Sequence, residues 1–149
     1  MRRLLLGFLL VAGGCSSFSA AGRAQAKRDS AAQESLKTQL TRSLNEFRRS
    51  LKGKVWDSVA EFCFREDPDV VRALKTRTEA LWKRGQLLDL VLEVRKVTRD
   101  KDFYVAQVRW ERTLLERGQL LKEEGKCEMF FKKIEGNYVI FSVSPEAFF

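Results

Sequence analysis

The second half of the chain alternates between apolar and polar residues, and this period of two predicts β-strands. Four such segments lie between residues 87 and 143, separated by short polar turns that contain Gly, Asp or Asn. A long hairpin made by residues 103–115 and 119–133 lies at their centre. Because a meander of this kind buries one face, we predict an antiparallel sheet whose apolar face is covered by another layer.

The apolar members of each predicted strand identify the face that should be buried. In chain order they are Leu88, Leu90, Leu92 and Val94, then Tyr104, Ala106, Val108 and Trp110, then Leu121, Cys127, Met129 and Phe131, and last Val139, Phe141 and Val143. Gly125 interrupts the third strand, and a glycine inside a strand is typical of a bulge. We therefore predict a strongly bent sheet.

Before the sheet, apolar residues recur at spacings of three and four, which predicts helices. The first helix has its apolar stripe within residues 36–51 and ends at Gly53, and a shorter helix follows over 56–64. The third begins at Asp67-Pro68, a typical N-cap, and ends at Gly85. The fold class predicted is α+β, with three helices packed on the sheet. A surface-seeking amphipathic helix is the alternative interpretation of the first helix.

The first residues have the form of a secretory signal peptide. Two arginines precede an apolar run over residues 4–12, which is shorter than the roughly 20 residues needed to span a bilayer. Next comes Ala12-Gly13-Gly14-Cys15-Ser16, which resembles the lipobox of bacterial lipoproteins. The resemblance implies that residues 1–14 are removed and that Cys15 carries acyl chains such as palmitate. The serine after the cysteine is similar to an outer-membrane sorting signal, so we expect a lipoprotein of the outer membrane that faces the periplasm in a Gram-negative cell.

Two alternatives remain for this region. Cleavage after Ala24-Gln25-Ala26 would release a soluble exported protein, and an uncleaved segment would act as an anchor. Residues 15–33 lack apolar periodicity and are rich in Ser, Ala and charge, which predicts a flexible tether ahead of a single domain over 34–149. Arg23, Lys27 and Arg28 in this tether favour an anionic membrane surface.

Composition and charge narrow the classes of partner. Hydrophobic residues make up 44% of the 149 residues and charged residues 32%, as in one ordinary globular domain. The net charge of +8 favours an anionic lipid or envelope polymer as a partner, and a solvated basic face is the alternative. We expect no nucleic acid, because core packing explains the spacing of Phe103, Tyr104 and Trp110.

The order of the elements resembles a known superfamily. Helices followed by a meander of long strands, with a closing hairpin over residues 130–140, are similar to the cone-shaped nuclear transport factor two-like domains. The resemblance covers roughly residues 36–144, and a cystatin-like sheet around a helix is the alternative. The superfamily includes isomerases, dehydratases and cyclases with a pocket as well as binding modules. The resemblance in fold therefore does not by itself select a function.

The residues needed for catalysis are only partly present. The sequence has no histidine, which removes Ser-His and Cys-His nucleophilic pairs. An acid–base pocket of the isomerase kind would need an inward carboxyl group beside a tyrosine, and the candidates are Asp89, Glu93 and Tyr104. Both acids are more simply explained as residues at the outward, solvent-facing positions of an alternating strand. We expect a protein that is not an enzyme and that holds no metal or cofactor; the enzyme of the same superfamily is the alternative.

The function predicted is binding, either of an apolar ligand between helices and sheet or of an envelope protein on the sheet. The residues expected to line that cavity, or to form plain core, are Trp56, Phe62, Leu74, Trp82, Tyr104, Val108, Trp110 and Met129. Cys63 and Cys127 are predicted either as a disulfide or as buried free thiols. Phe148 and Phe149 are interpreted as a docking tail or as an aromatic pair folded over the sheet edge.

Overall fold

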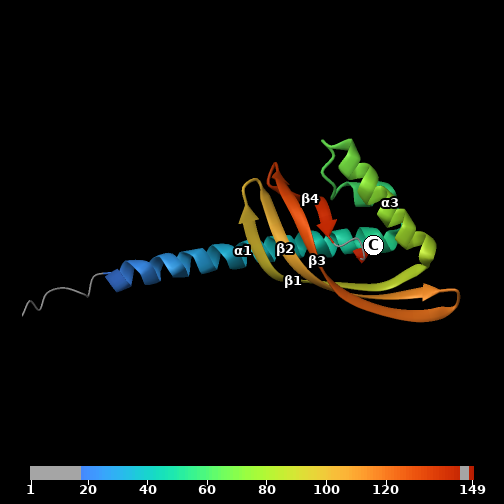
Figure 1. Ribbon diagram of the computed structural model, residues 1–149, viewed down its shortest axis with the longest axis horizontal. Coiled ribbons are helices and arrows are strands. Elements are labelled where there is room, and N and C mark those ends of the chain that lie inside the picture. The colour runs from blue at the N-terminus through green and yellow to red at the C-terminus, as the bar shows by residue number, and fades with distance from the viewer. Residues whose placement is uncertain (1–17, 145–147) are drawn as a thin grey trace, which may run out of the picture. The chain divides into compact units, whose positions relative to one another are not determined.

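The computed structural model describes residues 18–144 and 148–149, with side chains from Arg23 onward. Its elements are α1 (Phe18–Gly53), α2 (Trp56–Ala60), α3 (Pro68–Arg84), β1 (Gln86–Asp100), β2 (Phe103–Glu116), β3 (Gln119–Ile134) and β4 (Asn137–Ser144), which Figure 1 shows. The chain divides into two units, residues 1–32 and 33–149. The predicted α+β fold class is confirmed. Cys15, the predicted lipid anchor, lies outside the described residues.

The region predicted as a tether is helical where the structure describes it. Residues 18–33 belong to α1, whereas the sequence predicts a flexible segment over 15–33. The missing apolar periodicity was the wrong criterion, because Ala, Gln, Lys and Arg are strong helix formers without any packing partner. Consistent with the polar pattern, the side chains from Arg23 to Ser35 are exposed. No helix in the part of the chain that the structure describes is long and apolar enough to cross a bilayer.

The sheet has the order β1-β2-β3-β4, with every neighbouring pair antiparallel. Two of its hairpins turn at Arg117-Gly118 and Glu135-Gly136, where all four residues have positive φ, as two-residue turns of the primed type require. The long strands bend along their length (Figure 1). Register shifts, which mark bulges, lie in β1 near Leu87 and Val94 and between β3 and β4 at Phe130.

Three predictions about the sheet are wrong in detail. On β4, Val139 and Phe141 are predicted to face inward, but Tyr138 and Ile140 are the buried residues, and a register shift at Phe141 returns the alternation to Val143.

The first bulge of β1 changes the phase of the alternation, so Leu87 is buried and Leu88 is 37% exposed. Gly125 does not form a bulge, since it pairs in regular register with Trp110. A Cβ at Gly125 would lie 2.6 Å from Cζ2 of the Trp110 ring, so the glycine makes room for the indole.

The inner face of the sheet is covered by the second part of α1 and by α3. Ser43 Oγ donates to the carbonyl of Tyr138 on β4, and Arg48 Nη1 donates to the carbonyl of Leu90 on β1. The helix is therefore bonded to the two edge strands of the sheet. From α3, Trp82 Nε1 donates to the carbonyl of Leu51 at 2.9 Å. One continuous core results, built from α1, α3 and the inner face.

Candidate functional site

The residues predicted to line an apolar cavity are part of this core. Leu74, Val108, Trp110 and Met129 belong to the buried cluster, and Met129 has no exposed surface. The other four candidates, Trp56, Phe62, Trp82 and Tyr104, are half-buried and pack against the cluster. The structure thus places all eight residues together, and it places them as packing residues of the core.

Phe148 contributes to the same core. Its side chain is 1% exposed, and its ring meets the Trp110 ring edge-on with 6.0 Å between centroids. The ring of Phe149 lies 4.8 Å from that of Phe148, again edge-on. The sequence offers this pair as a docking tail or as a cover for the sheet edge. The structure differs from both interpretations, because Phe148 is inserted beside Trp110 on the inner face.

Arg112 is the charged residue that the fold places among these apolar side chains. It follows Trp110 on the inner face of β2, and its side chain is 3% exposed. Arg112 Nε donates to Glu123 Oε2 at 2.6 Å, and Nη1 donates to the backbone carbonyl of Phe148 at 2.6 Å. The guanidinium lies 4.9 Å from the centroid of the Trp110 ring. These contacts compensate a buried cation that would otherwise be destabilising.

Glu123 links this buried arginine to the end of α3. Arg84 Nη2 donates to Glu123 Oε1 at 2.7 Å and lies 3.4 Å from Glu116 Oε2. The hydrogen bonds from Arg84 and Arg112 hold the pKa of Glu123 below its ordinary value, although partial burial opposes them. The four residues carry two positive and two negative charges. The cluster is therefore neutral as a whole.

The carboxyl groups nominated for catalysis lie on the exposed face of β1. The side chain of Asp89 is 63% exposed and lies 4.0 Å from Lys52 Nζ. Glu93 is 50% exposed and pairs with Arg95 at 2.7 Å. Tyr104 is half-buried and packs edge-on against Tyr138 with centroids 5.2 Å apart. The structure does not bring either acid together with Tyr104, so these three residues do not form the acid–base arrangement that the enzyme alternative required.

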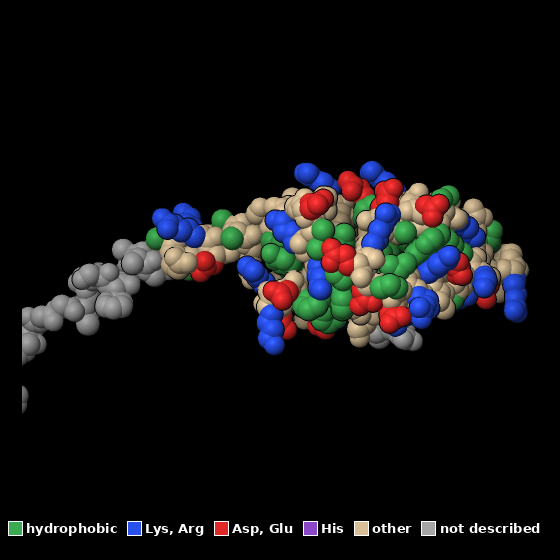
Figure 2. All heavy atoms as spheres, turned by 90° about the horizontal axis from the view of Figure 1, so that it is seen from above, with side chains coloured by type: hydrophobic (Ala, Val, Ile, Leu, Met, Phe, Trp, Pro, Cys, Tyr) green, Lys and Arg blue, Asp and Glu red, His purple; other side chains and the backbone are tan. Residues whose placement is uncertain are grey.

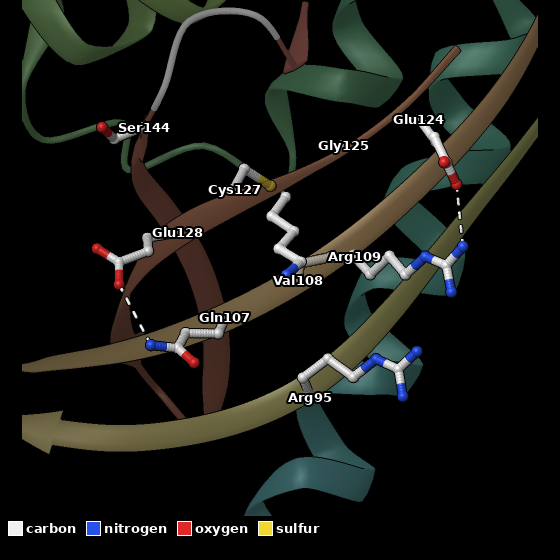
Figure 3. Close-up of a pocket in the computed structure, with 10 residues that line it drawn as sticks. Arg95, Gln107, Val108, Arg109, Glu124, Gly125, Cys127, Glu128 and Ser144 are labelled. Carbon is white, nitrogen blue, oxygen red and sulfur yellow. Dashed lines mark hydrogen bonds and ion pairs between the residues drawn. The ribbon is translucent and has the colours of Figure 1, made fainter. Parts of the chain in front are cut away.

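An open groove of about 1010 Å³ lies over the outer face of the sheet. Its side chains come from alternate positions of β1, β2 and β3, namely Arg95, Gln107, Arg109, Glu124, Lys126 and Glu128. Figure 3 shows Arg109 bonded to Glu124 and Gln107 bonded to Glu128 across the strands. Lys126 is exposed, and no ion pair is found for it among the described residues. The charged side chains of the groove are thus of mixed sign and slightly basic in sum, whereas most of its exposed lining is apolar.

On the face of the domain shown in Figure 2, basic side chains do not gather in one region. Lys and Arg side chains alternate there with Asp and Glu, and apolar side chains lie between them. On the outer sheet face, one lysine is partly withdrawn from solvent: Lys132 Nζ lies 4.3 Å from the ring centroid of Phe64 and 5.0 Å from that of Phe141. This cation–π cluster packs the segment after α2 against β4.

Cys63 and Cys127 are separate buried thiols. The predicted disulfide is therefore not formed in the structure, and the alternative of buried free thiols describes both residues. Desolvation raises the pKa of Cys63 to about 11 and that of Cys127 to about 12. Thiols with such values are poor nucleophiles and poor metal ligands at neutral pH. Among the described residues, no group of three His, Cys, Asp or Glu side chains is placed to hold a metal ion.

Arg112 was not among the candidates from the sequence, although a signal for it is present. Positions 106, 108 and 110 were assigned to the inner face, and the period of two places residue 112 on that face as well. A charged residue at an inward position is an exception that calls for a partner. Glu123 was also missed, because its pairing depends on the register of β3 against β2, in which Arg112 and Glu123 are opposite each other.

No protein-family model matches the sequence, and no curated protein matches it. In structure, the chain is similar to a nuclear transport factor 2 (NTF2-like) superfamily protein from Salmonella enterica, with a TM-score of 0.59 and 15% identity over 74% of this chain and 89% of that chain. A conserved protein from Planctomyces limnophilus gives a TM-score of 0.58 and 6% identity over 74% and 94% of the two chains. Aln2 from Streptomyces gives a TM-score of 0.58 and 12% identity over 73% of this chain and 88% of that chain. The chain has the nuclear transport factor two-like fold.

Proposed function

We propose that this protein is a lipid-anchored lipoprotein of the bacterial cell envelope whose domain binds a partner protein without catalysing a reaction. The anchor in this proposal is Cys15, within its lipobox-like sequence at the end of the apolar run. Exposed Arg23, Lys27 and Arg28 on the first part of α1 support attraction to anionic head groups, each contributing up to about 1 kcal/mol. An acyl anchor and a basic segment together bind a membrane more strongly than either does alone. The outer membrane, with the domain in the periplasm, is the location proposed for a Gram-negative cell.

Partner binding is favoured over ligand binding because the interior is already occupied. The observation that carries this step is the insertion of Phe148 against Trp110, with Arg112 bonded to its carbonyl. Phe148 and the cavity candidates belong to one packed core, so the positions predicted for an apolar ligand are filled by the chain's own side chains. The outer face of the sheet, in contrast, carries an open groove of a size that side chains of another protein can enter.

The chemistry of the groove indicates the kind of partner. Cross-strand pairs such as Arg109 with Glu124 compensate most of its charge, and Lys126 adds one positive charge. A surface of this mixed kind favours hydrogen bonding with specific geometry over attraction by net charge. We therefore propose a folded envelope protein with a polar, slightly acidic surface as the partner. A polyanionic polymer would bind more strongly to a continuous basic patch than to this mixed surface.

Site-specific photo-crosslinking in intact cells tests this assignment. A photoreactive phenylalanine analogue is placed at Lys126 in the groove and, as a matched control, at Lys83, which is an exposed lysine on α3. We expect a discrete crosslinked species from position 126 that is absent from position 83 and that weakens when Arg109 is changed to Glu. The absence of any species specific to position 126 would contradict partner binding at the groove.

A further inference from the structure

The two edges of the sheet differ in what covers them. β4, at one edge, is closed by the segment after α2, because Phe64 N–H donates to the carbonyl of Ile140 at 2.9 Å and Ile140 N–H donates to the carbonyl of Phe62 at 2.6 Å. β1, at the other edge (Figure 1), pairs with β2 alone. Among the described residues, no backbone hydrogen bond joins the outer side of β1 to another element. β1 is therefore an open edge.

One side-chain contact shows which backbone groups of β1 point outward. Arg48 Nη1 donates to the carbonyl of Leu90 at 3.1 Å, so this carbonyl points away from β2. In an antiparallel pair, the backbone groups of successive residues alternate between the two sides of the strand. Those of Leu92 and Val94 therefore point outward as well. For their carbonyls, no side-chain donor is found in the described part of the chain.

The covered edge leads to the same result for the far end of β1. Ile140 bonds to the segment after α2, so its partner Phe131 directs its own backbone groups toward β2. There they face Tyr104, and Arg99, which is opposite Tyr104 on β1, therefore directs its groups away from the sheet. Val97, two residues earlier, does the same. The N–H and C=O groups of Val97 and Arg99 thus offer two donors and two acceptors to an added strand.

The charge of this edge indicates which kind of strand it accepts. Within residues 95–101, four positive side chains accompany one negative side chain, namely Arg95, Lys96, Arg99 and Lys101 with Asp100. Arg95 is paired with Glu93 at 2.7 Å, and for the other three cations no ion pair is found among the described residues. An acidic segment beside this edge would supply the missing carboxylates.

The same charges disfavour a second copy of the chain as the occupant. Two β1 edges laid side by side would bring two basic segments together, and like charges on neighbouring strands repel each other. Lysine and a bulge, both present near Lys96, are common means of preventing an edge strand from pairing with its own kind. They do not oppose a strand of opposite charge.

We propose that the open edge of β1, between Leu92 and Arg99, binds an extended acidic segment of another protein as an added strand. The backbone of that segment bonds to Val97 and Arg99, and its carboxylates lie beside Lys96 and Arg99. The contact uses the edge of the sheet and the backbone of β1. It is therefore distinct from the groove on the outer face and does not rest on the function proposed there.

Hydrogen exchange followed by NMR tests the proposal on the full chain in micelles of a neutral detergent. Before any peptide is added, the amide N–H groups of Val97 and Arg99 should exchange rapidly, whereas that of Ile140, bonded to Phe62, should exchange slowly. The probe is the peptide acetyl-Glu-Val-Glu-Val-Glu-Val-Glu-amide. At about ten times its dissociation constant it should slow exchange at Val97 and Arg99 by about ten-fold and leave Ile140 unchanged.

Two control peptides separate charge from backbone pairing. In the first, lysine replaces every glutamate, so the peptide keeps its tendency to form a strand but has the wrong charge. In the second, proline replaces the central valine, which interrupts strand pairing and keeps every carboxylate. We expect both to bind more weakly than the probe by about ten-fold, as measured by the concentration that half-protects Val97.

A pair of charge variants locates the binding site. Lys96→Glu with Arg99→Glu should raise the half-saturating concentration of the acidic peptide by about ten-fold, because attraction at the edge becomes repulsion. Lys83→Glu with Lys122→Glu is the matched control. It makes the same change in net charge at two exposed lysines of α3 and β3 and should leave the value unchanged.

Three results would overturn the proposal, and all are obtained with the unaltered chain. The first is slow exchange at Val97 and Arg99 before peptide is added, since the edge would then be covered. The second is the absence of a response to the acidic peptide, or an equal response to all three peptides. The third is protection that grows with protein concentration alone, which would make a second copy the occupant. Crosslinking from Lys126 reports separately on the outer face, so the two proposals fail independently.

Discussion

The indole of Trp110 lies directly over Gly125 of the neighbouring strand, so close that an added Cβ would stand 2.6 Å from Cζ2 and 2.8 Å from Cε2 of the ring. The two residues are opposite each other in the regular register of β2 and β3. The inward positions of β3 that the structure buries carry larger side chains, Cys127, Met129 and Phe131. Gly125 therefore fixes where the largest ring of the inner face can lie, and with it the position that Phe148 occupies.

Gly125→Ala should destabilise the protein by about 1–3 kcal/mol, because the added methyl group must displace the buried indole or bend the strand. Urea unfolding followed by circular dichroism measures the change. Gly53→Ala is the matched control. Nothing lies within 4 Å of a Cβ at Gly53, and alanine favours helix, so we expect a gain of about 0.5 kcal/mol there. Equal stability of wild type and Gly125→Ala would show that Trp110 does not occupy this place.

Glu123→Gln should destabilise the protein by about 2–3 kcal/mol at pH 7. The change keeps the shape of the side chain but leaves Arg112, 3% exposed, without its counter-charge. Glu111→Gln is the control, because its partner Arg109 is 40% exposed and water replaces the lost contact. If the two variants unfolded at the same urea concentration, Arg112 would not be buried against Glu123.

The stability difference between wild type and Glu123→Gln should depend on pH in a defined direction. The pKa of Glu123 is lower in the folded protein than its ordinary value. The contribution of its charge is therefore complete above the ordinary pKa of about 4.3 and is lost as the pH falls through the lower value of the folded state. The urea midpoints of wild type and Glu123→Gln, measured at pH 7, 5, 4 and 3, should become equal at the lowest pH. A difference that grew on acidification would have the wrong sign.

Cys63 and Cys127 should not react with Ellman's reagent in the folded protein at pH 8, and both should react in 6 M urea. Burial keeps both thiols neutral, with pKa values of about 11 and about 12 in place of 9.0. Because the unfolded chain releases these protons first, stability should fall as the pH rises above about 9. Cys63→Ala with Cys127→Ala should lack this fall. A disulfide would instead leave both residues unreactive in urea until a reductant is added.

The order of the elements could be predicted from the sequence because periodicity is a local property. The spacing of Leu36 to Leu51 defines the buried stripe of α1, and Asp67 caps α3 as predicted by accepting from the backbone N–H of Asp69. The inward set of β1 follows the period of two from Leu90 to Val94, and a second bulge then moves the next buried position to Val97. It fails at Leu88, because a bulge shifts the phase and nothing in the local pattern marks that bulge.

What the sequence pattern did not reveal depends on contacts between distant residues. Gly125 was interpreted as a bulge because a glycine is locally ambiguous, and its actual role follows from Trp110 on another strand. Arg112 meets Glu123 through strand register and Phe148 through the return of the chain to the core, 36 residues later. The candidate cavity residues all lie in or against one core. Whether the space between them is empty is decided by Phe148, which periodicity does not place.

Intact mass spectrometry of the protein purified from membranes with detergent tests the central claim most directly. The account predicts a chain that begins at Cys15 and carries the added mass of acyl chains, and a Cys15→Ser variant from which that added mass is absent. The lipidated species should remain with the membrane fraction at high salt, because an acyl anchor does not depend on charge. An unlipidated species that begins at Lys27, after Ala24-Gln25-Ala26, would contradict the account and would make the protein a soluble exported domain.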